Sequence, residues 1–486
     1  MTLVLGIDVG TQGARAMVVD LQGNLRAQAT SPFPTSAILA NEAGWFEQDP
    51  ASWRDAAVAV VAQVVSQLHS EAVSSEAITA LSVTSTSGTL CLVDHAGRPV
   101  RDAIMYSDTR SSEVAKQVQA AGAELAAKLG IRFSASYALS KLAWVQANEP
   151  RILDRARWLA SPTDLVIGWL SGVWGQSDWT NALKWGYDVV DLGWPAFIGD
   201  SLGIDTQKLP VVGSPGRPLG HVCQAMADAT GLSTKTLVVA GSTDGTASQL
   251  ASGACSPGDW NSTLGTTLVL KGVTEELISD PQGRIYSHRH PDGYWLPGGA
   301  SSAGADCLST RFSADDLPDL NAAALAVSPT SLIVYPLVRK GERFPFADPE
   351  AQGFTIGDTD DERVRYTAHL EGLAYVERLC FQVLRDLGGQ VGNALHVAGG
   401  ATKSQAGLQI RADVLETHLL VPSLPQGAMG AAILAASNCG FDSVADTARA
   451  MVHYAQTVDP RPEMVASYHS PFERFVAACA ERGYVA

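Results

Sequence analysis

Residues 3–20 of the chain read LVLGIDVGTQGARAMVVD, two apolar runs joined by a turn rich in glycine. The first run, residues 3–7, has the length and composition of a short buried strand, and Asp8 ends it. A second apolar run covers residues 16–20. A strand, a glycine turn and a strand in this order predict a β-hairpin at the start of the chain.

The next two segments predict a helix and a third strand. Asp49 is a natural helix N-cap, and Pro50 suits the first helical position. From Trp53 to Leu68, apolar residues recur at helical spacing. The apolar run at 80–84 then predicts a buried strand. Strands that alternate with helices indicate an α/β domain.

A similar order of elements restarts near residue 236. The run at 237–241 predicts a strand that leads into serine, threonine and aspartate, and a helix of small residues follows. Residues 261–270 predict another strand–turn–strand unit, and residues 394–398 predict a strand that runs into two glycines. The two halves of the chain therefore look like variations on one plan.

At 486 residues, the chain is longer than one hydrophobic core usually supports. We therefore expect two domains, an N-terminal one at residues 1–235 and a C-terminal one at residues 236–486. The proline-rich segment 211–218 predicts a loop just before this boundary.

The composition is that of an ordinary globular protein, with 46% hydrophobic and 17% charged residues. Asp and Glu number 50 against 34 Lys and Arg, which gives a net charge of −16, and no basic block is visible. This balance argues against nucleic acid as a partner. A small phosphate ligand is still compatible with it, because local backbone N–H groups can hold phosphate.

The seven cysteines are scattered and include no CxxC pair, so we expect neither a zinc site nor a disulfide framework. The N-terminus has no basic region before its apolar run, and no segment is long and apolar enough to cross a bilayer. We expect a cytoplasmic protein with reduced thiols and no membrane partner.

The first glycine turn offers groups suited to phosphate and metal. Glycine lets backbone approach a phosphate closely, and Thr11 and Gln12 offer donors for phosphate oxygens. Asp8 at the strand end could hold Mg²⁺ through water, because Mg²⁺ keeps much of its hydration shell. A plain hairpin turn, in which these residues serve only turn geometry, explains the segment equally well.

Asp244 stands where the strand at 237–241 gives way to a helix, in the segment GSTDG at 241–245. A carboxylate in this place could accept a proton from a substrate hydroxyl and orient it for phosphoryl transfer. Taken alone, the local sequence fits a helix N-cap better.

Two further glycine segments could hold a nucleotide. Gly265 and Thr266 lie in the predicted turn of the second strand–turn–strand unit and would suit a phosphate. Gly399 and Gly400 follow a predicted strand, where an adenine or ribose could lie flat against the backbone. Simple turns are the alternative for both segments, and a lone glycine turn is weak evidence.

The order and spacing of these segments resemble the FGGY family of carbohydrate kinases over nearly the whole chain. Residues 6–11 resemble the family's first phosphate motif, and Asp244 falls on its catalytic aspartate. Other landmarks follow in the family's order: GWFEQDP at 44–50 with Trp53, SDTR at 107–110, PTD at 162–164, LSG at 170–172, SDWTNA at 177–182, the glycines at 399–400, Gln409, ADVL at 412–415 and GAMGAA at 427–432.

The resemblance implies an α/β fold of two actin-like (ribonuclease H-like) domains that flank a central cleft. It implies an ATP-dependent kinase that uses Mg²⁺, with ATP mainly against the C-terminal domain and a sugar mainly against the N-terminal one. Asp244 would be the catalytic residue. The other implied contacts are Asp8, Ser87 and Asp244 with the sugar, Thr11, Gln12, Gly13, Gly265, Thr266, Gly399, Gly400 and Ser404 with ATP, and Asp8 with the metal through water.

The segment after the third strand bears on which sugar is used. Typical xylulose kinases carry QMHG there, whereas this chain has STSGT at 85–89, so hydroxyls replace a histidine and a methionine. The segment resembles the D-ribulose kinases of plants and cyanobacteria, as do longer stretches at 177–184, 286–289, 295–301 and 341–349. We therefore expect D-ribulose as the substrate and D-ribulose 5-phosphate as the product. Ser87 would be the hydroxyl that meets the sugar, and D-xylulose is the alternative substrate.

Two other classes of protein are weighed against a sugar kinase. One is a weak ATPase without efficient sugar transfer, and the other is an actin-like chaperone or filament former, which the sugar-kinase landmarks disfavour.

Gly407 stands where many family members carry a tryptophan over adenine, which predicts a more open adenine pocket. We expect structural roles for His288 and His290 and a surface or cleft-edge loop at 341–349. The oligomeric state, a homodimer included, is left open.

Overall fold

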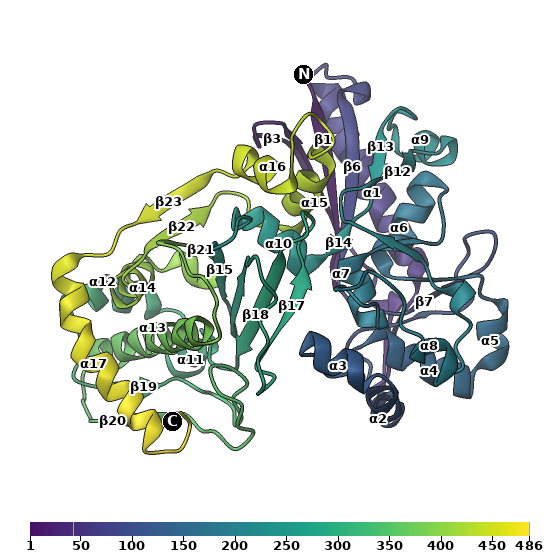
Figure 1. Cartoon of the computed structure of the whole chain (residues 1–486). Helices are drawn as coiled ribbons and strands as arrows, with labels where there is room; N and C mark the ends of the chain where they lie inside the picture. Colours follow the sequence, from purple (N-terminus) through teal and green to yellow (C-terminus); the bar gives the residue numbers. More distant parts are fainter. Residues whose placement is uncertain (42, 486) are drawn as a thin grey trace. The chain divides into compact units, whose positions relative to one another are not determined.

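The computed structural model describes residues 1–41 and 43–485, and these residues form two compact units (Figure 1). The first unit comprises Met1–Ala251, His288–Gly293 and Leu424–Val452. The second comprises Ser252–Ser287, Tyr294–Ser423 and His453–Ala486. Each unit has a central sheet with helices packed against it, so the chain has the predicted two-domain α/β fold.

A seven-stranded sheet forms the centre of the first unit. Its strands are β1 (Leu3–Val9), β2 (Gly13–Asp20), β3 (Leu25–Pro32), β6 (Ile78–Ser85), β12 (Pro218–His221), β13 (Leu237–Val239) and β14 (Ser242–Thr243). They lie in the order β12-β13-β6-β1-β2-β3, and β14 pairs with β6. The predicted hairpin is confirmed, because β1 and β2 pair antiparallel with Asp8 opposite Arg15. The predicted third strand, β6, runs parallel to β1.

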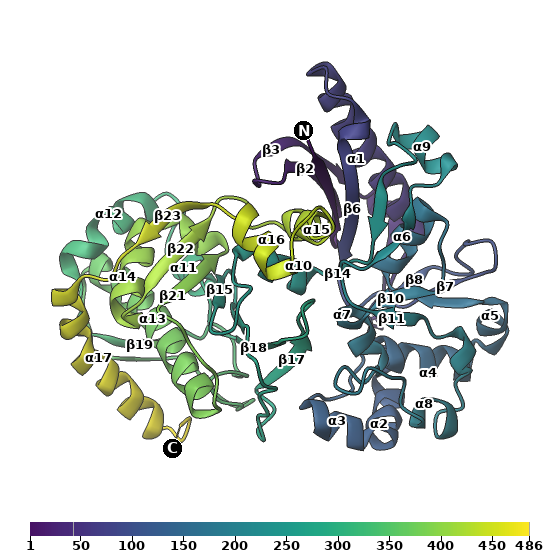
Figure 2. The same cartoon turned by 45° about the horizontal axis from the view of Figure 1, so that its top comes forward.

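Side chains along β1 point alternately to the two faces of the sheet, so each face of the strand packs against different helices. The residues at odd positions from Leu3 to Val9 pack with α1 (Pro50–Ser70) and α6 (Pro162–Ser171) in one core. Gly6, on the other face, lies so close to α15 (Gly427–Ala436) that a β-carbon there would stand 1.8 Å from the Ala428 carbonyl oxygen. Both views show α15 beside β1 and β6 (Figures 1 and 2). Because successive side chains point to opposite faces, Asp8 shares the α15 face with Gly6.

The second unit repeats this strand plan. Its strands are β15 (Trp260–Leu264), β16 (Leu268–Gly272), β17 (Ile285–Arg289), β18 (Trp295–Ser301), β21 (Ala394–Ala398), β22 (His418–Pro422) and β23 (Tyr454–Val458). The order is β17-β18-β16-β15-β21-β22-β23. Strand β15 pairs antiparallel with β16 and parallel with β21, as β1 does with β2 and β6. The outer pair β22 and β23 matches β13 and β12, so the expectation of two halves on one plan is confirmed.

The second copy of the plan begins later than the sequence indicates. Strands β13 and β14 pair with β6 in the first sheet, so the run at 237–241 does not open the second unit. Residues 424–452 return to the first unit, because α15 is buried along nearly its whole length and packs against β1 and β6. The compact units therefore differ from the predicted limits of 1–235 and 236–486. The segment 211–218 is not the expected loop, since it contains β11 (Val211–Gly213) and the start of β12.

The remaining elements surround the two sheets. In the first unit these are β4 (Ile38–Ala40), β5 (Phe46–Gln48), β7 (Cys91–Val93), β8 (Ala103–Ile104), β9 (Trp158–Ala160), β10 (Gln176–Asp178), α2 (Ser112–Ala121), α3 (Ala123–Leu129), α4 (Ala138–Asn148), α5 (Pro150–Arg155), α7 (Trp179–Ala182), α8 (Phe197–Asp200), α9 (Gln224–Thr230) and α16 (Val444–Met451). The helix α10 (Asp244–Ser252) ends at the boundary. In the second unit they are α11 (Asp306–Arg311), α12 (Leu317–Val327), β19 (Ile333–Tyr335), β20 (Phe354–Ile356), α13 (Glu362–Asp386), α14 (Gln405–Leu415) and α17 (Pro462–Ala480).

Other sequence predictions can be compared directly with this structure. The helix predicted after Asp49 is α1, and the Asp49 carboxylate accepts a hydrogen bond from Ala51 N at 2.9 Å. In the described part of the chain, no disulfide joins any of the seven cysteines. None of the helices that the structure describes has the length and apolar composition to cross a membrane.

Candidate active site

Two of the predicted carboxylates lie at the same edge of the first sheet. Asp8 is near the carboxyl end of β1, and Asp244 directly follows β14. Both strands run parallel to β6 and flank it, so their carboxyl ends share one edge. Burial raises the pKa of Asp8 to about 6, against the opposing effect of Arg15, and the nearby charge of Asp244 adds to the rise. The two carboxylates therefore interact, as the sequence predictions require of a joint site.

The surroundings of Asp8 combine burial with two positive contributions. Only 8% of the residue is exposed, and Arg15 Nη1 lies 3.3 Å from its Oδ2. The first residue of α15 is also adjacent, since a β-carbon at Gly427 would lie 3.2 Å from the Asp8 carboxyl carbon. The N-terminus of a helix favours negative charge. Both contributions favour the charged form of the Asp8 carboxylate, against the effect of its burial.

Asp244 is the first residue of α10, so the helix cap predicted for it falls one residue earlier. The Thr243 hydroxyl accepts a hydrogen bond from Thr246 N at 3.4 Å, in the manner of an N-cap. The Asp244 carboxylate accepts one from Gly245 N at 2.7 Å and is half-buried. Its position at the strand–helix junction is the one that a carboxylate acting on a substrate hydroxyl would need.

Asp8 fits a magnesium ion as a contact through water, with the charge of Asp244 nearby. Two carboxylates that share a poorly hydrated edge repel each other, and a divalent cation removes that repulsion. Within residues 1–41 and 43–485, no group of three or more His, Cys, Asp or Glu side chains could hold a metal ion. Mg²⁺ in phosphoryl-transfer sites is usually held by one or two carboxylates together with water and substrate phosphates, and Asp8 could supply the protein's share while Asp244 stays available to a substrate hydroxyl.

The tip of the β1–β2 hairpin carries Thr11 and Gln12, both exposed. The Thr11 hydroxyl lies 3.5 Å from the Tyr106 hydroxyl. Gly13 is buried, and a β-carbon there would stand 2.5 Å from the Ser31 carbonyl oxygen, so the pairing of β2 with β3 accounts for this glycine. The hydroxyl and amide at the tip are accessible to a ligand, while Gly13 has a packing role of its own.

The hydroxyl-rich segment 85–89 divides into structural and available groups. The Ser85 hydroxyl lies 2.6 Å from the Thr163 hydroxyl, and Thr89 Oγ1 accepts a hydrogen bond from Tyr106 N at 3.2 Å. Ser87 is half-buried, and none of the described residues bonds its hydroxyl. Unlike the hydroxyls of Ser85 and Thr89, that of Ser87 therefore has its bonding capacity left for a substrate.

The predicted phosphate residues of the second unit lie at the tip of the β15–β16 hairpin. This tip matches the β1–β2 tip in the repeated plan. Gly265 N donates to the Thr267 carbonyl at 3.0 Å, and the Gly265 carbonyl accepts from Ala305 N at 2.7 Å. Thr266 is exposed, so its hydroxyl is accessible.

Gly400 and Ser404 line a pocket of about 300 Å³ in the second unit. A β-carbon at Gly400 would meet nothing within 4 Å, whereas one at Gly399, where φ is +93°, would stand 2.4 Å from the Leu264 carbonyl oxygen. The walls combine many apolar groups with a few polar ones, as small-molecule pockets usually do. The principal lining residues are Leu264, Leu308, Leu317, Tyr366, Leu370, Leu373, Asn321, Lys403, Ser404, Gly407 and Arg411.

Ser404 has a second task at this pocket. Its hydroxyl accepts a hydrogen bond from Gly407 N at 2.9 Å and so caps α14, and it also donates to Asn321. Burial raises the pKa of Tyr366, which also interacts with Ser404 and Asn321. The structure thus joins Ser404 to two polar residues that the sequence analysis did not single out.

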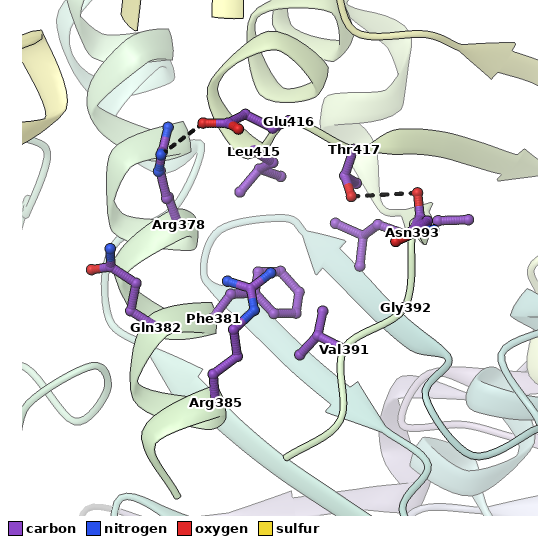
Figure 3. Close-up of a pocket in the computed structure, with 12 residues that line it drawn as sticks. Arg378, Phe381, Gln382, Arg385, Val391, Gly392, Asn393, Leu415, Glu416 and Thr417 are labelled. Carbon is purple, nitrogen blue, oxygen red and sulfur yellow. Dashed lines mark hydrogen bonds and ion pairs between the residues drawn. The ribbon is translucent and has the colours of Figure 1, made fainter. Parts of the chain in front are cut away.

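A different pocket of the second unit, about 350 Å³ in volume, contains none of the predicted site residues (Figure 3). Arg378 and Arg385 project from α13 toward it. Arg378 is already engaged, because it pairs with Glu416 at 2.8 Å and donates to the Val414 carbonyl at 2.8 Å. We assign this pocket no part in the predicted reaction.

Two of the family landmarks come together as scaffold. The guanidinium of Arg110, from SDTR, pairs with Asp108 at 2.8 Å and with Glu47, from GWFEQDP, at 2.7 Å. The same guanidinium lies over the Trp45 ring at 4.1 Å and the Trp144 ring at 5.1 Å. These contacts link segments that are distant in the sequence, which explains their spacing without a catalytic role.

Two further landmarks cap helices. Ser161 and Asp164 form a capping box at the start of α6, and Ser177 donates to Asp164 at 2.9 Å. Burial, with the nearby charge of Asp178, raises the pKa of Asp164 to about 7. Asp178 caps α7 through the backbone N–H groups of Thr180 and Asn181.

The segment at 341–349 is more buried than the surface or cleft-edge loop that we expected from the sequence. Phe344 and Phe346 are buried in the core of the second unit, so the segment anchors its aromatic side chains and is not simply a surface loop.

His290 is also buried and accepts a hydrogen bond from Asp292 N at 3.1 Å. Burial lowers the pKa of His290 to about 4.

Sequence reasoning missed several groups near the candidate site. Gly427 lies inside a family motif and Arg15 lies just after one, but neither had a predicted role, and their proximity to Asp8 depends on strand pairing and helix packing. Lys184, in the stretch 177–184, lies close enough to Asp244 for their charges to interact. A lysine within the largely apolar run at 182–187 was the available signal.

Comparisons with known proteins cover nearly the whole chain. Residues 3–251 match the model for the FGGY family of carbohydrate kinases, N-terminal domain, and residues 260–439 match the C-terminal domain. The xylulose kinase of Bacillus subtilis (strain 168) is 27% identical, with 98% of this chain and 96% of that protein covered. A glycerol kinase of Pseudomonas putida is also 27% identical, with 92% and 90% covered. The crystal structure of xylulose kinase from Rhodospirillum rubrum superposes with a TM-score of 0.86 at 27% identity, with 99% and 98% covered.

Proposed function

Because the chain belongs to the FGGY family of carbohydrate kinases, which transfer phosphate from ATP to sugars, we propose that its acceptor is a ketopentose. The observation that carries the proposal is the Asp8 and Asp244 pair at one sheet edge, within a chain whose full length matches named xylulose kinases. Ser87, with its unengaged hydroxyl, is the proposed sugar contact in the same unit.

In the proposed reaction, Asp244 orients a terminal sugar hydroxyl and accepts its proton. The hydroxyl oxygen forms a bond to the γ-phosphorus of ATP while the bond from that phosphorus to the β,γ-bridging oxygen breaks, and ADP leaves. Little covalent work falls to the protein in such a transfer, so positioning and charge stabilisation dominate. The carboxylate's place at the start of α10 supports this role.

Asp8 is the proposed metal contact, through water, with Asp244 nearby. Bound Mg²⁺ would neutralise charge on the transferring phosphoryl group. Asp8 itself would hold and orient the metal's water shell, and Arg15 would keep the carboxylate in place, as their 3.3 Å contact supports. Thr11 and Gln12 at the nearby hairpin tip are proposed to donate to phosphate oxygens, and Gly13 allows the close strand pairing that supports the tip.

The second unit is proposed to bind the nucleotide. The pocket beside Gly400 and Ser404 would take the adenine and ribose, and its mixed lining supports this. Gly399 would allow the backbone to turn sharply at the pocket's edge, and Gly265 and Thr266 would contact phosphates.

Two ketopentoses are candidates for the acceptor. D-xylulose is favoured by the relatives named xylulose kinase, in both the sequence and the structure comparisons. D-ribulose is favoured by a specific feature of this chain, the STSGT segment at 85–89, which departs from the QMHG of typical xylulose kinases. The relatives support a ketopentose as the class of acceptor. The STSGT segment bears on the choice between D-xylulose and D-ribulose within that class.

A coupled assay of ADP release across D-xylulose, D-ribulose, L-ribulose, ribitol and glycerol tests the proposal. We expect a ketopentose to give the highest kcat/KM, and the ratio of D-xylulose to D-ribulose assigns the substrate. ADP release that is equal with and without every sugar would instead indicate an ATPase. A preference for glycerol would contradict the ketopentose assignment while leaving the kinase family intact.

A further inference from the structure

The pocket drawn in Figure 3 is bordered by the C-terminal half of α13, the segment 391–395 and residues 415–417 at the end of α14. Its volume of about 350 Å³ is in the range of small-molecule sites. Among the described residues, its lining has no member in common with that of the pocket beside Gly400 and Ser404. A ligand bound here would therefore leave the proposed nucleotide pocket free.

One face of α13 supplies polar groups to this pocket. Arg378, Gln382 and Arg385 follow one another at spacings of four and three residues, which places them on the same side of the helix. Both guanidinium groups project from α13 toward the pocket (Figure 3). A guanidinium only donates hydrogen bonds, and a glutamine amide offers two further N–H donors. This face of α13 is therefore suited to a ligand that accepts hydrogen bonds.

The two guanidinium groups differ in their engagement. Arg378 pairs with Glu416 at 2.8 Å and donates to the Val414 carbonyl at 2.8 Å. Within the part of the chain that the structure describes, no hydrogen bond or ion pair engages the Arg385 guanidinium or the Gln382 side chain. The donors of Arg385 and Gln382 are therefore available to a ligand.

The charge of the lining is positive, although the protein is strongly acidic. The charged lining residues are two arginines and one glutamate, a net charge of +1, whereas the whole chain has −16. Glu416 is already engaged, because Arg378 Nη2 and His469 Nε2 each lie 2.8 Å from its Oε1. The charge of Arg385 is thus the one that the lining does not balance, and it favours an anionic ligand.

We propose that this pocket binds a small phosphorylated metabolite, whose phosphate group meets the Arg385 guanidinium and the Gln382 amide. A guanidinium binds phosphate oxygens bidentately, and the third oxygen of a phosphomonoester remains for the neighbouring amide. Phe381, Val391 and Leu415 are apolar parts of the wall and would contact the carbon atoms of the ligand. The inference does not depend on the proposed reaction.

The first test titrates the protein with 3-phosphoglycerate in phosphate-free buffer and follows binding by ³¹P nuclear magnetic resonance, with saturating ADP to occupy the nucleotide pocket. Wild-type protein is expected to bind this probe with a Kd of about 0.1 to 1 mM. Arg385→Gln should weaken binding about 10- to 100-fold, the loss typical of a hydrogen bond to a charged group. Gln382→Glu should weaken it similarly, because a glutamate three positions before Arg385 would pair with the guanidinium and repel phosphate.

Arg151→Gln is the matched control, since it removes the charge of an exposed arginine on α5 in the first unit. Melting curves on the same samples show whether each variant is folded, and all of these positions except that of Arg378, which is not replaced, are exposed. Absence of binding to the wild type, or equal affinity in the wild type and Arg385→Gln, would overturn the inference.

The second test distinguishes the sources of the anion and locates the site. D-glycerate, the same carbon skeleton without phosphate, should bind at least about 10-fold more weakly than 3-phosphoglycerate, and inorganic phosphate at least about fivefold more weakly. Equal binding of D-glycerate would refute recognition of phosphate, and equal binding of inorganic phosphate would refute an organic ligand. In hydrogen–deuterium exchange, 3-phosphoglycerate should protect residues 391–395 and 415–417. Protection confined to other segments would place the bound probe elsewhere and overturn the inference.

Discussion

Gly427, the first residue of α15, approaches Asp8 so closely that a β-carbon on it would lie 3.2 Å from the carboxyl carbon and 3.3 Å from Oδ2. The approach results from the packing of α15 on the face of β1 that also carries Gly6. One helix that is distant in sequence thereby fixes the carboxylate at the edge of the first sheet. The glycine is part of the site through its lack of a side chain.

Gly427→Ala is expected to lower kcat/KM for the pentulose by about 10-fold, because the carboxylate must move by a few tenths of an ångström to make room. Steady-state kinetics with a melting curve on the same sample measures the effect. Gly193→Ala is the matched control, since a β-carbon at Gly193 would meet nothing within 4 Å. Full activity in Gly427→Ala would mean that the position of Asp8 is not critical.

Asp244→Asn should lower kcat by about 10²- to 10⁴-fold, the range for loss of a general base, while the melting temperature stays near that of the wild type. ATP should bind with unchanged affinity in isothermal titration, because the proposed nucleotide contacts lie elsewhere. Asp55→Asn, at an exposed position of α1, serves as the control. If kcat in Asp244→Asn fell less than about fivefold, Asp244 would not be the base.

Side chains added at Gly400 should interfere with ATP in proportion to their size. The series Gly400→Ala, Gly400→Val and Gly400→Leu places increasing volume beside the pocket of about 300 Å³. KM for ATP is expected to rise stepwise, by about 10-fold or more at leucine, and KM for the sugar should stay constant. An equal ATP KM throughout the series would place the nucleotide outside this pocket.

The buried carboxyl of Asp164 predicts a pH-dependent stability. Burial raises its pKa from 3.8 to about 7, so the folded protein keeps a proton that the unfolded chain has already lost between these pH values. The contribution of this group to the free energy of unfolding is therefore fully present below about pH 4 and disappears as the pH rises through about 7. Asp164→Asn cannot ionise, so its free energy of unfolding relative to the wild type should rise from pH 5 to pH 8.

Urea denaturation of both proteins at the two pH values measures that difference. Asp361→Asn provides the contrast, because Arg363 lowers the pKa of Asp361 to about 2 and the group is ionised in both states from pH 5 to pH 8. Its effect on the free energy of unfolding should not vary over this range. A parallel response of the two variants would show that Asp164 is already ionised in the folded protein at pH 5.

The parts of this fold that follow from sequence are those with local signals. The hairpin of β1 and β2 and the start of α1 depend on alternation, glycine and a cap within a few residues of one another, and these predictions are confirmed. The return of α15 to the first unit depends on packing between residues more than 400 positions apart, which no local pattern records. The N-cap of α10 is Thr243, one residue before the predicted Asp244. Both residue types cap helices well, so the local sequence does not determine which of the two is the cap.

The candidate site also contains some residues that local sequence signals predict and others that only the folded structure brings together. Asp8 and Asp244 could be named as candidates because each stands near the end of a predicted strand, and the carboxyl ends of parallel strands share an edge. The neighbours that shape them, Arg15, Lys184 and Gly427, depend on pairing and packing and emerge only in three dimensions.

Proton-coupled ³¹P nuclear magnetic resonance of the reaction products tests the central claim most directly. Wild-type protein with ATP, Mg²⁺ and D-xylulose or D-ribulose should yield ADP and a phosphomonoester split by the two protons of the terminal sugar carbon. Asp244→Asn should yield neither within the same time. ADP and inorganic phosphate without any phosphomonoester, or the same sugar phosphate at the same rate from Asp244→Asn, would contradict the claim.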